Sequence, residues 1–350
     1  MMSNADVVVN GRFMVHRVTG IPRYGYELVR RLGRRVRVIA PPSGLKGQAG
    51  HLWEQMILPN YVRDRLLWSP HGSGPLVISR QVVTIHDMAT FEHPEWFAPI
   101  YVAWYNYLIP RLTRRARHII TISNFSKQRL IDILGIPPEK VTVIYNGVSS
   151  YFAPQPSSAI FKVRQKLGIP TPHYVLYLGT LEPRKNLNGV LEAWTLLTKT
   201  LPSDIWLVIA GSIERSPVFR DFRLLNMPAR VHRLGYVRDE FLPALYSGAL
   251  VFIYVSYYEG FGLPPLEAMA CGTPVVVSNG SSLPEVVGDA GIQVNPFNTD
   301  EIASAVQSVI ENTSLRKHLQ AKGLARAKLF TWDRTAEQTW QLLRAIADSC

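Results

Sequence analysis

Short runs of valine, isoleucine and leucine recur along this chain of 350 residues, with longer stretches of helical apolar spacing between them. Runs of the first kind are typical of buried parallel strands, and stretches of the second kind of amphipathic helices. Their alternation predicts an α/β protein with parallel sheets. The expected strands are Ala5–Val9, Val36–Ala40, Leu66–Trp68, Val82–His86, His118–Ile122 and Val141–Tyr145, then Tyr174–Leu178, Trp206–Ala210, Val231–Leu234, Leu250–Val255, Pro274–Ser278 and Gly291–Val294.

The segment Asn146–Ser158 lies between two halves of similar pattern and is rich in Asn, Gly, Ser and Pro, as linkers are. We therefore expect two Rossmann-like domains, residues 1–152 and 153–332. Apolar residues at helical spacing from Trp332 to Ile346 predict a last helix, about 333–350, that packs back on the first domain. Ligands of open α/β sheets bind outside the carboxyl ends of the strands, so we expect the ligand in a cleft where the two domains face each other.

Composition favours a globular protein of the cytosol. No apolar run reaches the roughly 18 residues that a membrane-spanning helix needs, and Met1–Asn10 lacks the layout of a signal peptide. The two cysteines, Cys271 and Cys350, predict neither a disulfide framework nor a metal cluster.

The net charge of +12 is concentrated in the first half of the chain. Residues 1–150 carry 19 Lys and Arg against 9 Asp and Glu, whereas residues 151–350 carry 19 against 17. This asymmetry predicts an anionic partner for the first half. Charge alone does not decide between a nucleic acid and a membrane surface.

The stretch from Glu259 to Glu267 is the most informative candidate for chemistry. It follows a predicted strand and runs into a predicted helix, so that Glu259 lies in the loop and Glu267 in the first helical turn. Two such carboxylates, with free loop N–H groups between them, suit a ligand that carries hydroxyls and phosphates. The simpler alternative is that Glu267 complements the helix dipole and that Glu259 is solvated.

The two glutamates, with seven residues between them, resemble the paired-glutamate motif of the retaining family 4 glycosyltransferases, which have the GT-B fold. The resemblance continues through Ala268–Val276 and Ser282–Gly291. It implies that Glu259 contacts the hydroxyls of the donor sugar and that Glu267 contacts the ribose. The backbone N–H groups between them, which would bind the sugar and the diphosphate, belong to Phe261, Gly262 and Leu263.

A second candidate segment runs from Gly179 to Asn186 and contains Arg184 and Lys185 at a predicted helix start. Adjacent cations and a helix dipole together favour an anion there, although a solvated pair is the alternative. The family resemblance places Gly179, Arg184 and Lys185 on the donor diphosphate. No Asp-x-Asp sequence occurs in the chain, so we expect these cations to take the place of a metal ion and predict no metal or other cofactor.

Two loops of the first half supply further candidates. Gly20 precedes a predicted helix and resembles the first glycine-bearing loop of the family, which usually has two glycines where this chain has Thr19 and Gly20. We place Gly20 on the donor, and Arg23 and Tyr24 on the acceptor side. His86 and Asp87 lie at the end of a predicted strand, where a lone histidine is more often structural than catalytic. The family often places a histidine here beside the reacting sugar, so the resemblance implies that His86 positions this sugar and that Asp87 lies on the acceptor side.

The resemblance is strongest from about Tyr174 to Val294 and is closest to bacterial mannosyltransferases of surface-polysaccharide assembly. It implies a hexosyltransferase that retains the anomeric configuration, with GDP-mannose as the expected donor and a saccharide or lipid-linked saccharide as the acceptor. The loop Gly235-Tyr236-Val237 is the expected contact of the base, and UDP- and dTDP-sugars stay open. The departing phosphate itself is expected to take the proton of the acceptor, so no protein nucleophile is assigned.

Aromatic residues followed by arginines mark the stretch Trp96–Arg117. This order suits a helix that rests on an anionic membrane surface, which would make the protein cytoplasmic and peripheral on the inner face of the plasma membrane. The alternative is a core-packed helix with a solvated basic end.

Three other functions compete with glycosyl transfer. A dinucleotide-dependent dehydrogenase needs a Gly-x-Gly-x-x-Gly loop after the first strand, where this chain has Asn10-Gly11-Arg12-Phe13. A non-enzymatic basic module has no explanation for Glu259 and Glu267, and no nucleic-acid motif is present, so we expect no nucleic-acid partner. A sugar-nucleotide epimerase of the same fold stays as the closer alternative.

Overall fold

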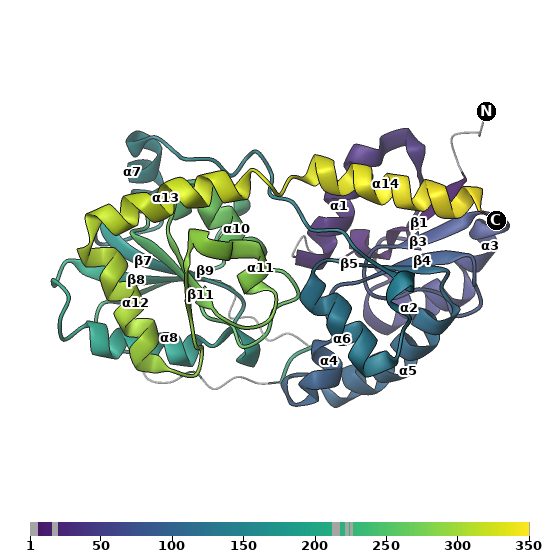
Figure 1. Cartoon of the computed structure of the whole chain (residues 1–350), viewed down its shortest axis with the longest axis horizontal. Coiled ribbons are helices and arrows are strands. Elements are labelled where there is room, and N and C mark those ends of the chain that lie inside the picture. The colour runs from purple at the N-terminus through teal and green to yellow at the C-terminus, as the bar shows by residue number, and fades with distance from the viewer. Residues whose placement is uncertain (1–5, 16–19, 212–217, 221–223, 225–226, 350) are drawn as a thin grey trace. The chain divides into compact units, whose positions relative to one another are not determined.

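The computed structural model describes residues 6–15, 20–211, 218–220, 224 and 227–349. The chain forms two compact units (Figure 1). The first unit consists of Met1–Pro94, Pro99–Gly147 and Thr331–Cys350, and the second of Glu95–Ala98 and Val148–Phe330. The division after Gly147 lies a few residues before the expected one, and the short segment Glu95–Ala98 of the first half belongs to the second unit.

In the described part of the first unit, six parallel strands form one sheet in the order β2-β1-β3-β4-β5-β6. Val83 and Ile85 point into a core on one face of this sheet, whereas Thr84 between them contacts Trp68 and Tyr24 on the other. The strands are β1 (Val7–Asn10), β2 (Arg37–Ile39), β3 (Leu66–Ser69), β4 (Gln81–Ile85), β5 (His118–Thr121) and β6 (Val141–Val143).

Helices cover both faces of the first sheet (Figure 1). Helices α1 and α14 pack together on one face, and α5 and α6 contribute Leu112 and Leu130 to the core on the other. The helices are α1 (Gly20–Leu32), α2 (Gly47–Met56), α3 (Pro59–Val62), α4 (Ala89–Glu92), α5 (Pro99–Arg115), α6 (Asn124–Leu134) and α14 (Trp332–Asp348).

The described part of the second unit has a parallel six-stranded sheet in the order β12-β11-β10-β7-β8-β9. Read from β9, this is the Rossmann order 3-2-1-4-5-6. The strands are β7 (His173–Leu178), β8 (Ile205–Ala210), β9 (Val231–Gly235), β10 (Val251–Tyr254), β11 (Val275–Ser278) and β12 (Ile292–Val294).

One face of the second sheet packs against α8 and α12, where Trp194 and Val306 are buried with Val175 and Ile253. The other face carries Phe252 and Tyr254 toward α9 and α10. The helices are α7 (Ser157–Lys166), α8 (Leu187–Leu197), α9 (Leu242–Ser247), α10 (Leu263–Ala270), α11 (Leu283–Val287), α12 (Thr299–Glu311) and α13 (Thr313–Ala327).

The predicted α/β class and the two Rossmann-like sheets of the GT-B fold are confirmed, because each expected strand overlaps an observed one. Helix α14 lies on the first unit, where Thr335 Oγ1 donates to Tyr145 O at 2.7 Å and Trp332 is buried. A Cβ on Gly147 would meet Trp332 N at 2.1 Å, so only glycine permits this close approach.

Candidate functional site

The strand order of the second sheet reverses between β7 and β10, which pair side by side through Leu176 and Phe252. The loops that follow these two strands therefore start at neighbouring points of the carboxyl edge. They are the segments Gly179–Asn186 and Val255–Gly262, which contain the predicted cations and the first predicted glutamate. In doubly wound sheets this reversal is where ligands bind.

Asn186 fixes the loop after β7. It has a left-handed backbone (φ 54°), and its Oδ1 accepts from Gly189 N at 3.2 Å, which caps helix α8. Its Nδ2 donates to Val255 O at 3.1 Å and to Pro296 O at 2.8 Å. The short 3₁₀ helix η5 (Pro183–Lys185) therefore ends at a residue that is tied to the end of β10.

The loop after β10 is held by two serines. Ser281 Oγ accepts from Glu259 N at 3.2 Å, and Ser282 Oγ lies 2.8 Å from Glu259 O and 3.0 Å from Phe261 O. Gly262 has φ +108°, and a Cβ there would lie 2.5 Å from a methyl carbon of Leu283. A side chain at Gly262 would therefore strain the backbone and clash just before helix α10 begins.

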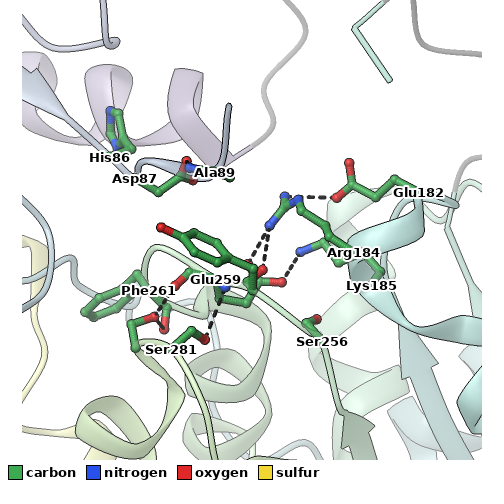
Figure 2. A network of polar contacts seen from close by, with 12 residues as sticks. His86, Asp87, Ala89, Glu182, Arg184, Lys185, Ser256, Glu259, Phe261 and Ser281 are labelled. Atoms are coloured by element: carbon green, nitrogen blue, oxygen red, sulfur yellow. Dashed lines mark hydrogen bonds and ion pairs between the residues drawn. The ribbon is translucent and has the colours of Figure 1, made fainter. Parts of the chain in front are cut away.

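Arg184, Lys185, Glu182 and Glu259 form one network, which Figure 2 shows; Arg184 is partly buried and the other three are buried. Lys185 Nζ lies 2.6 Å from Glu259 Oε1, and Arg184 Nη1 lies 3.1 Å from Glu259 Oε2. Arg184 Nη2 also pairs with Glu182 Oε1 at 2.9 Å. Two cations thus lie against two carboxylates, of which Glu182 is only 1% exposed.

The network shifts the pKa values of both Glu259 and Lys185. Burial would raise the pKa of the Glu259 carboxyl, but Lys185 and Arg184 outweigh burial and lower this pKa to about 2. Burial and the charge of Arg184 lower the pKa of the Lys185 ammonium. Glu259 is therefore an anion at neutral pH, fixed between two cations.

Glu267 is the fifth residue of α10 and therefore lies just beyond the first turn in which it was predicted; it is 7% exposed. The hydroxyl of Tyr246, on α9, donates to Glu267 Oε2 at 3.2 Å. Tyr246 is fully buried, and Thr273 Oγ1 donates to its backbone oxygen at 2.6 Å. The second predicted glutamate thus has a supporting hydrogen bond from a rigid side chain.

The ends of β7, β8 and β9 are joined by glycines. Gly179 N donates to Ala210 O at 3.0 Å, and Gly211 N donates to Gly235 O at 2.8 Å. A Cβ on Gly211 would lie 1.7 Å from Gly179 O, so this edge tolerates no side chain at Gly211. Beyond it, Tyr236 is 70% exposed and Val237 is buried, and their contacts with a base stay predictions.

In the first unit, His86 lies at the end of β4 and is 7% exposed. Its Nε2 lies 2.8 Å from the carbonyl oxygen of Pro70, which can only accept, so Nε2 carries a proton. Burial lowers the pKa of His86, which keeps the imidazole neutral. Asp87 Oδ1 accepts from Ala89 N at 3.0 Å at the start of α4.

Tyr24 does not present a surface to an acceptor. Its side chain is completely buried, its ring centroid lies 5.0 Å from that of His86, and its hydroxyl is 3.4 Å from Thr84 Oγ1. The helical spacing that put Tyr24 on α1 also turned it toward the sheet. We correct its expected role to one of support for His86.

Gly20 and Arg23 lie in the first turn of α1. Gly20 is exposed, and a Cβ there would meet nothing within 4 Å. Thr19 lies outside the described residues. The contacts expected of Gly20 and Arg23 with a ligand stay predictions.

The first unit contains a polar network that the sequence did not predict. It lies where the first sheet reverses its strand order, between β1 and β3. Glu54 Oε1 accepts from Asn10 Nδ2 at 2.6 Å and from Ser73 Oγ at 2.9 Å, and it lies 3.3 Å from Arg12 Nε. Arg12 Nε also donates to His71 Nε2 at 3.1 Å. Burial lowers the pKa of His71 to about 4.

The aromatic and basic stretch Trp96–Arg117 is divided between the two units. Trp96 stacks on Tyr257, and Phe97 is 5% exposed beside Phe219, all within the second unit. On α5, Ile100 is 67% and Tyr107 48% exposed. The arginines on and after α5 are exposed as well, at Arg111, Arg114, Arg115 and Arg117.

The described residues contain neither a helix that could span a membrane nor a cluster of metal ligands. No helix there has the length and apolarity to cross a membrane. No group of three or more His, Cys, Asp or Glu side chains there is arranged to hold a metal ion. The predicted independence of a metal or cofactor stays a prediction.

Comparison with known proteins decides the family. A family model for glycosyl transferases group 1 matches residues 160–326, and one for glycosyltransferase family 4 matches residues 67–150. O-antigen chain mannosyltransferase B of Escherichia coli is 36% identical over 279 residues, which are 79% of this chain and 73% of that protein. This chain belongs to the group 1 glycosyltransferases.

A second relative and a solved structure are also similar to this chain. Serotype-specific mannosyltransferase WbdA of Escherichia coli is 32% identical over 63% of this chain, which spans only 28% of that protein. Anabaena Alr3699/HepE, solved in complex with UDP-glucose, superposes with a TM-score of 0.77 at 20% identity over 97% of this chain and 99% of that one. The family resemblance that the glutamate motif indicated is thus confirmed, and the structural likeness supports the same fold.

Proposed function

We propose that this group 1 glycosyltransferase moves a mannosyl group from a nucleotide sugar, GDP-mannose, to a saccharide or lipid-linked saccharide, with retention of the anomeric configuration. The observation that carries the proposal is the network of Arg184, Lys185 and Glu259 at the reversal of the second sheet. Mannose is proposed because relatives with 36% and 32% identity are mannosyltransferases.

The proposed mechanism rests on preorganised charge. Arg184 and Lys185 stabilise the charge that develops on the departing diphosphate, and they need no metal ion to do so. Glu259 accepts hydrogen bonds from the hydroxyls of the sugar, and Glu267 accepts from the ribose. The departing phosphate removes the proton of the acceptor hydroxyl, so that no protein nucleophile takes part.

Other residues receive supporting roles in this proposal. Gly179 and the backbone of Phe261, Gly262 and Leu263 approach the sugar and the diphosphate, and Tyr236 approaches the base. From the first unit, we assign Gly20 to the donor phosphate and neutral His86 to the transferred sugar. Asp87 and Arg23 contact the acceptor.

A lipid-linked acceptor would bring the enzyme to a membrane. We propose that α5 rests on the anionic inner face of the plasma membrane, with Ile100 and Tyr107 at the surface and the exposed arginines near the lipid phosphates. Trp96 and Phe97 are excluded from this surface because they pack within the second unit. The protein would then be cytoplasmic and peripheral.

Thermal unfolding tests the proposed donor. A ligand that binds only the folded state raises the melting temperature by mass action. We expect GDP-mannose, in the presence of EDTA, to stabilise the wild type and Glu311→Ala, a change at an exposed helix end, but not Glu267→Ala. Stabilisation by UDP-glucose or dTDP-rhamnose instead would replace the donor, and no stabilisation by any nucleotide sugar would contradict glycosyl transfer.

Product analysis separates transfer from the epimerase alternative. Incubation of the enzyme with GDP-mannose and a mannose-terminated oligosaccharide is expected to give GDP and an elongated α-mannoside. Its anomeric proton and carbon signals in NMR report whether the configuration is retained. Release of GDP with free or isomerised sugar, and no elongated product, would favour the epimerase.

A further inference from the structure

Tyr254 is the last residue of β10, at a position where the strand pattern calls for an apolar core residue. Its side chain is 1% exposed, and its ring stacks on Phe252 with centroids 5.8 Å apart. A buried phenol hydroxyl needs a hydrogen-bond partner, because an unpaired one costs folding free energy. The partner here is the ammonium of Lys185, whose Nζ lies 2.5 Å from the Tyr254 hydroxyl.

The charge of Glu259 acts on the same hydroxyl. Burial and the charge of the Glu259 carboxylate raise the pKa of Tyr254 well above its usual value. The phenol is therefore neutral and accepts from Lys185. Since Lys185 Nζ also donates to Glu259 Oε1 at 2.6 Å, two hydrogen bonds hold the ammonium.

These two hydrogen bonds fix the direction of the Lys185 ammonium. An ammonium carries three protons and rotates freely unless its acceptors hold it. Among the described residues, Glu259 and Tyr254 account for two of the protons of Lys185. With these two directions set, the direction of the third N–H bond is set as well.

We infer that Tyr254 is a positioning residue of the donor site, which aims the third N–H bond of Lys185 at a phosphate oxygen of the nucleotide. This inference rests on the proposed function, because it takes Lys185 to bind the diphosphate. It assigns Tyr254 no contact with the substrate. The contribution of Tyr254 passes entirely through Lys185.

The chain offers a matched control in Tyr177, on the neighbouring strand β7. Tyr177 is also 1% exposed, and its hydroxyl donates to the backbone oxygen of Lys185 at 3.3 Å instead of contacting the ammonium. Tyr177→Phe and Tyr254→Phe therefore remove the same group at the same depth. Only the second changes the partners of Lys185 Nζ.

Calorimetry first measures the affinities of GDP, UDP and dTDP for the wild type. The affinities of the diphosphate that binds most tightly, and of its nucleoside, are then measured for the variants. We expect Tyr254→Phe to weaken the diphosphate about fivefold to tenfold and to change nucleoside affinity by less than about twofold. Tyr177→Phe should change neither by more than about twofold. In a Lys185→Met background, Tyr254→Phe should have no further effect, because the group that it positions is gone.

Three results would overturn the inference: unchanged diphosphate affinity in Tyr254→Phe, equal weakening of the nucleoside, or an effect that persists in Lys185→Met. If Tyr254→Phe fails to fold, Tyr254→Met fills the same space with an adaptable apolar chain, and the same comparisons apply. A wild type that binds no nucleoside diphosphate would contradict the proposed function together with this inference. Wild-type binding that the Tyr254 variants leave intact would contradict the inference alone.

Discussion

Arg12 Nε lies 3.3 Å from Glu54 Oε1, and both side chains are almost completely buried, with 6% and 0% of their surface exposed. A second Arg–Glu pair of the same unit, Arg35 and Glu337, has a similar separation of 3.2 Å but is half exposed at both ends. The two pairs therefore join the same chemical groups in different surroundings. Desolvation makes an unpaired charge far more costly in the first pair.

We expect Glu54→Ala to lower the free energy of unfolding by about 3 to 5 kcal/mol, because it leaves Arg12 buried without its counter-charge. Glu337→Ala should cost at most about 1 kcal/mol, because Arg35 stays hydrated. Urea unfolding followed by tryptophan fluorescence measures both. Equal losses in the two variants would contradict the assignment of the Glu54 pair as a buried charge pair.

Glu259→Gln should separate turnover from product binding. The change keeps the shape of the side chain but removes the negative charge that lies against Lys185 and Arg184. We expect donor turnover to fall by roughly 100-fold, as for the loss of a preorganised active-site group. GDP should bind more tightly, because the cations are less neutralised.

Initial rates of GDP release and calorimetry with GDP measure these two effects of Glu259→Gln. Glu311→Gln, at an exposed helix end, is the control and should match the wild type in both. A general loss of structure would weaken both turnover and GDP binding. Wild-type turnover in Glu259→Gln would remove Glu259 from the proposed mechanism.

Because of His71, we expect the free energy of unfolding to decrease in acid. In the folded chain its pKa is lowered by burial to about 4, below the ordinary value of 6.5. As pH falls from 6.5 to 4, His71 is therefore protonated in the unfolded chain but stays neutral in the folded chain. Because the unfolded state binds more protons, the free energy of unfolding decreases over this range. His71→Gln should show a smaller decrease than the wild type.

Urea unfolding at pH 7, 6, 5 and 4 tests the role of His71. Burial also lowers the pKa of His86, so His71→Gln should retain part of the pH dependence. His318→Gln, at an exposed position of α13, should follow the wild type at every pH. A His71→Gln curve parallel to that of the wild type would refute the prediction.

Vesicle flotation tests the membrane surface on α5. Glutamine replacing Arg111, Arg114, Arg115 and Arg117 together should lower binding to vesicles that contain phosphatidylglycerol by at least about tenfold. The control replaces four other arginines of the first unit, Arg30, Arg34, Arg35 and Arg37, and changes the net charge equally. If both sets lower binding alike, the attraction is general and α5 is not a membrane surface.

The sequence was sufficient for the strands and for the residues on the two loops of the second sheet. Strands were predictable because runs such as Val251–Tyr254 are apolar on both faces, as a sheet covered on both sides requires. Arg184, Lys185 and Glu259 were predictable because charged residues directly after such strands stand at the carboxyl edge. Their motif also extends over many neighbouring residues.

Other members of the sites left no signal of this kind. Tyr254 and Tyr246 look like core aromatics in sequence, and only their hydrogen bonds reveal a polar role. Glu54 lies beside Trp53 on a short helix that the pattern did not predict, and its partners Asn10 and Ser73 are far away along the chain. Long-range contacts of this kind depend on the tertiary fold, which no local pattern encodes.

Helix α14 completes the first unit, although the whole main segment of the second unit precedes it in the chain. On a ribosome, Val148–Phe330 is therefore fully synthesised before α14 can pack beside α1 on its face of the first sheet. The second unit can reach its native state first, and the first must wait with Tyr24 uncovered. Residues translated late thus set the time at which the earliest ones can finish folding.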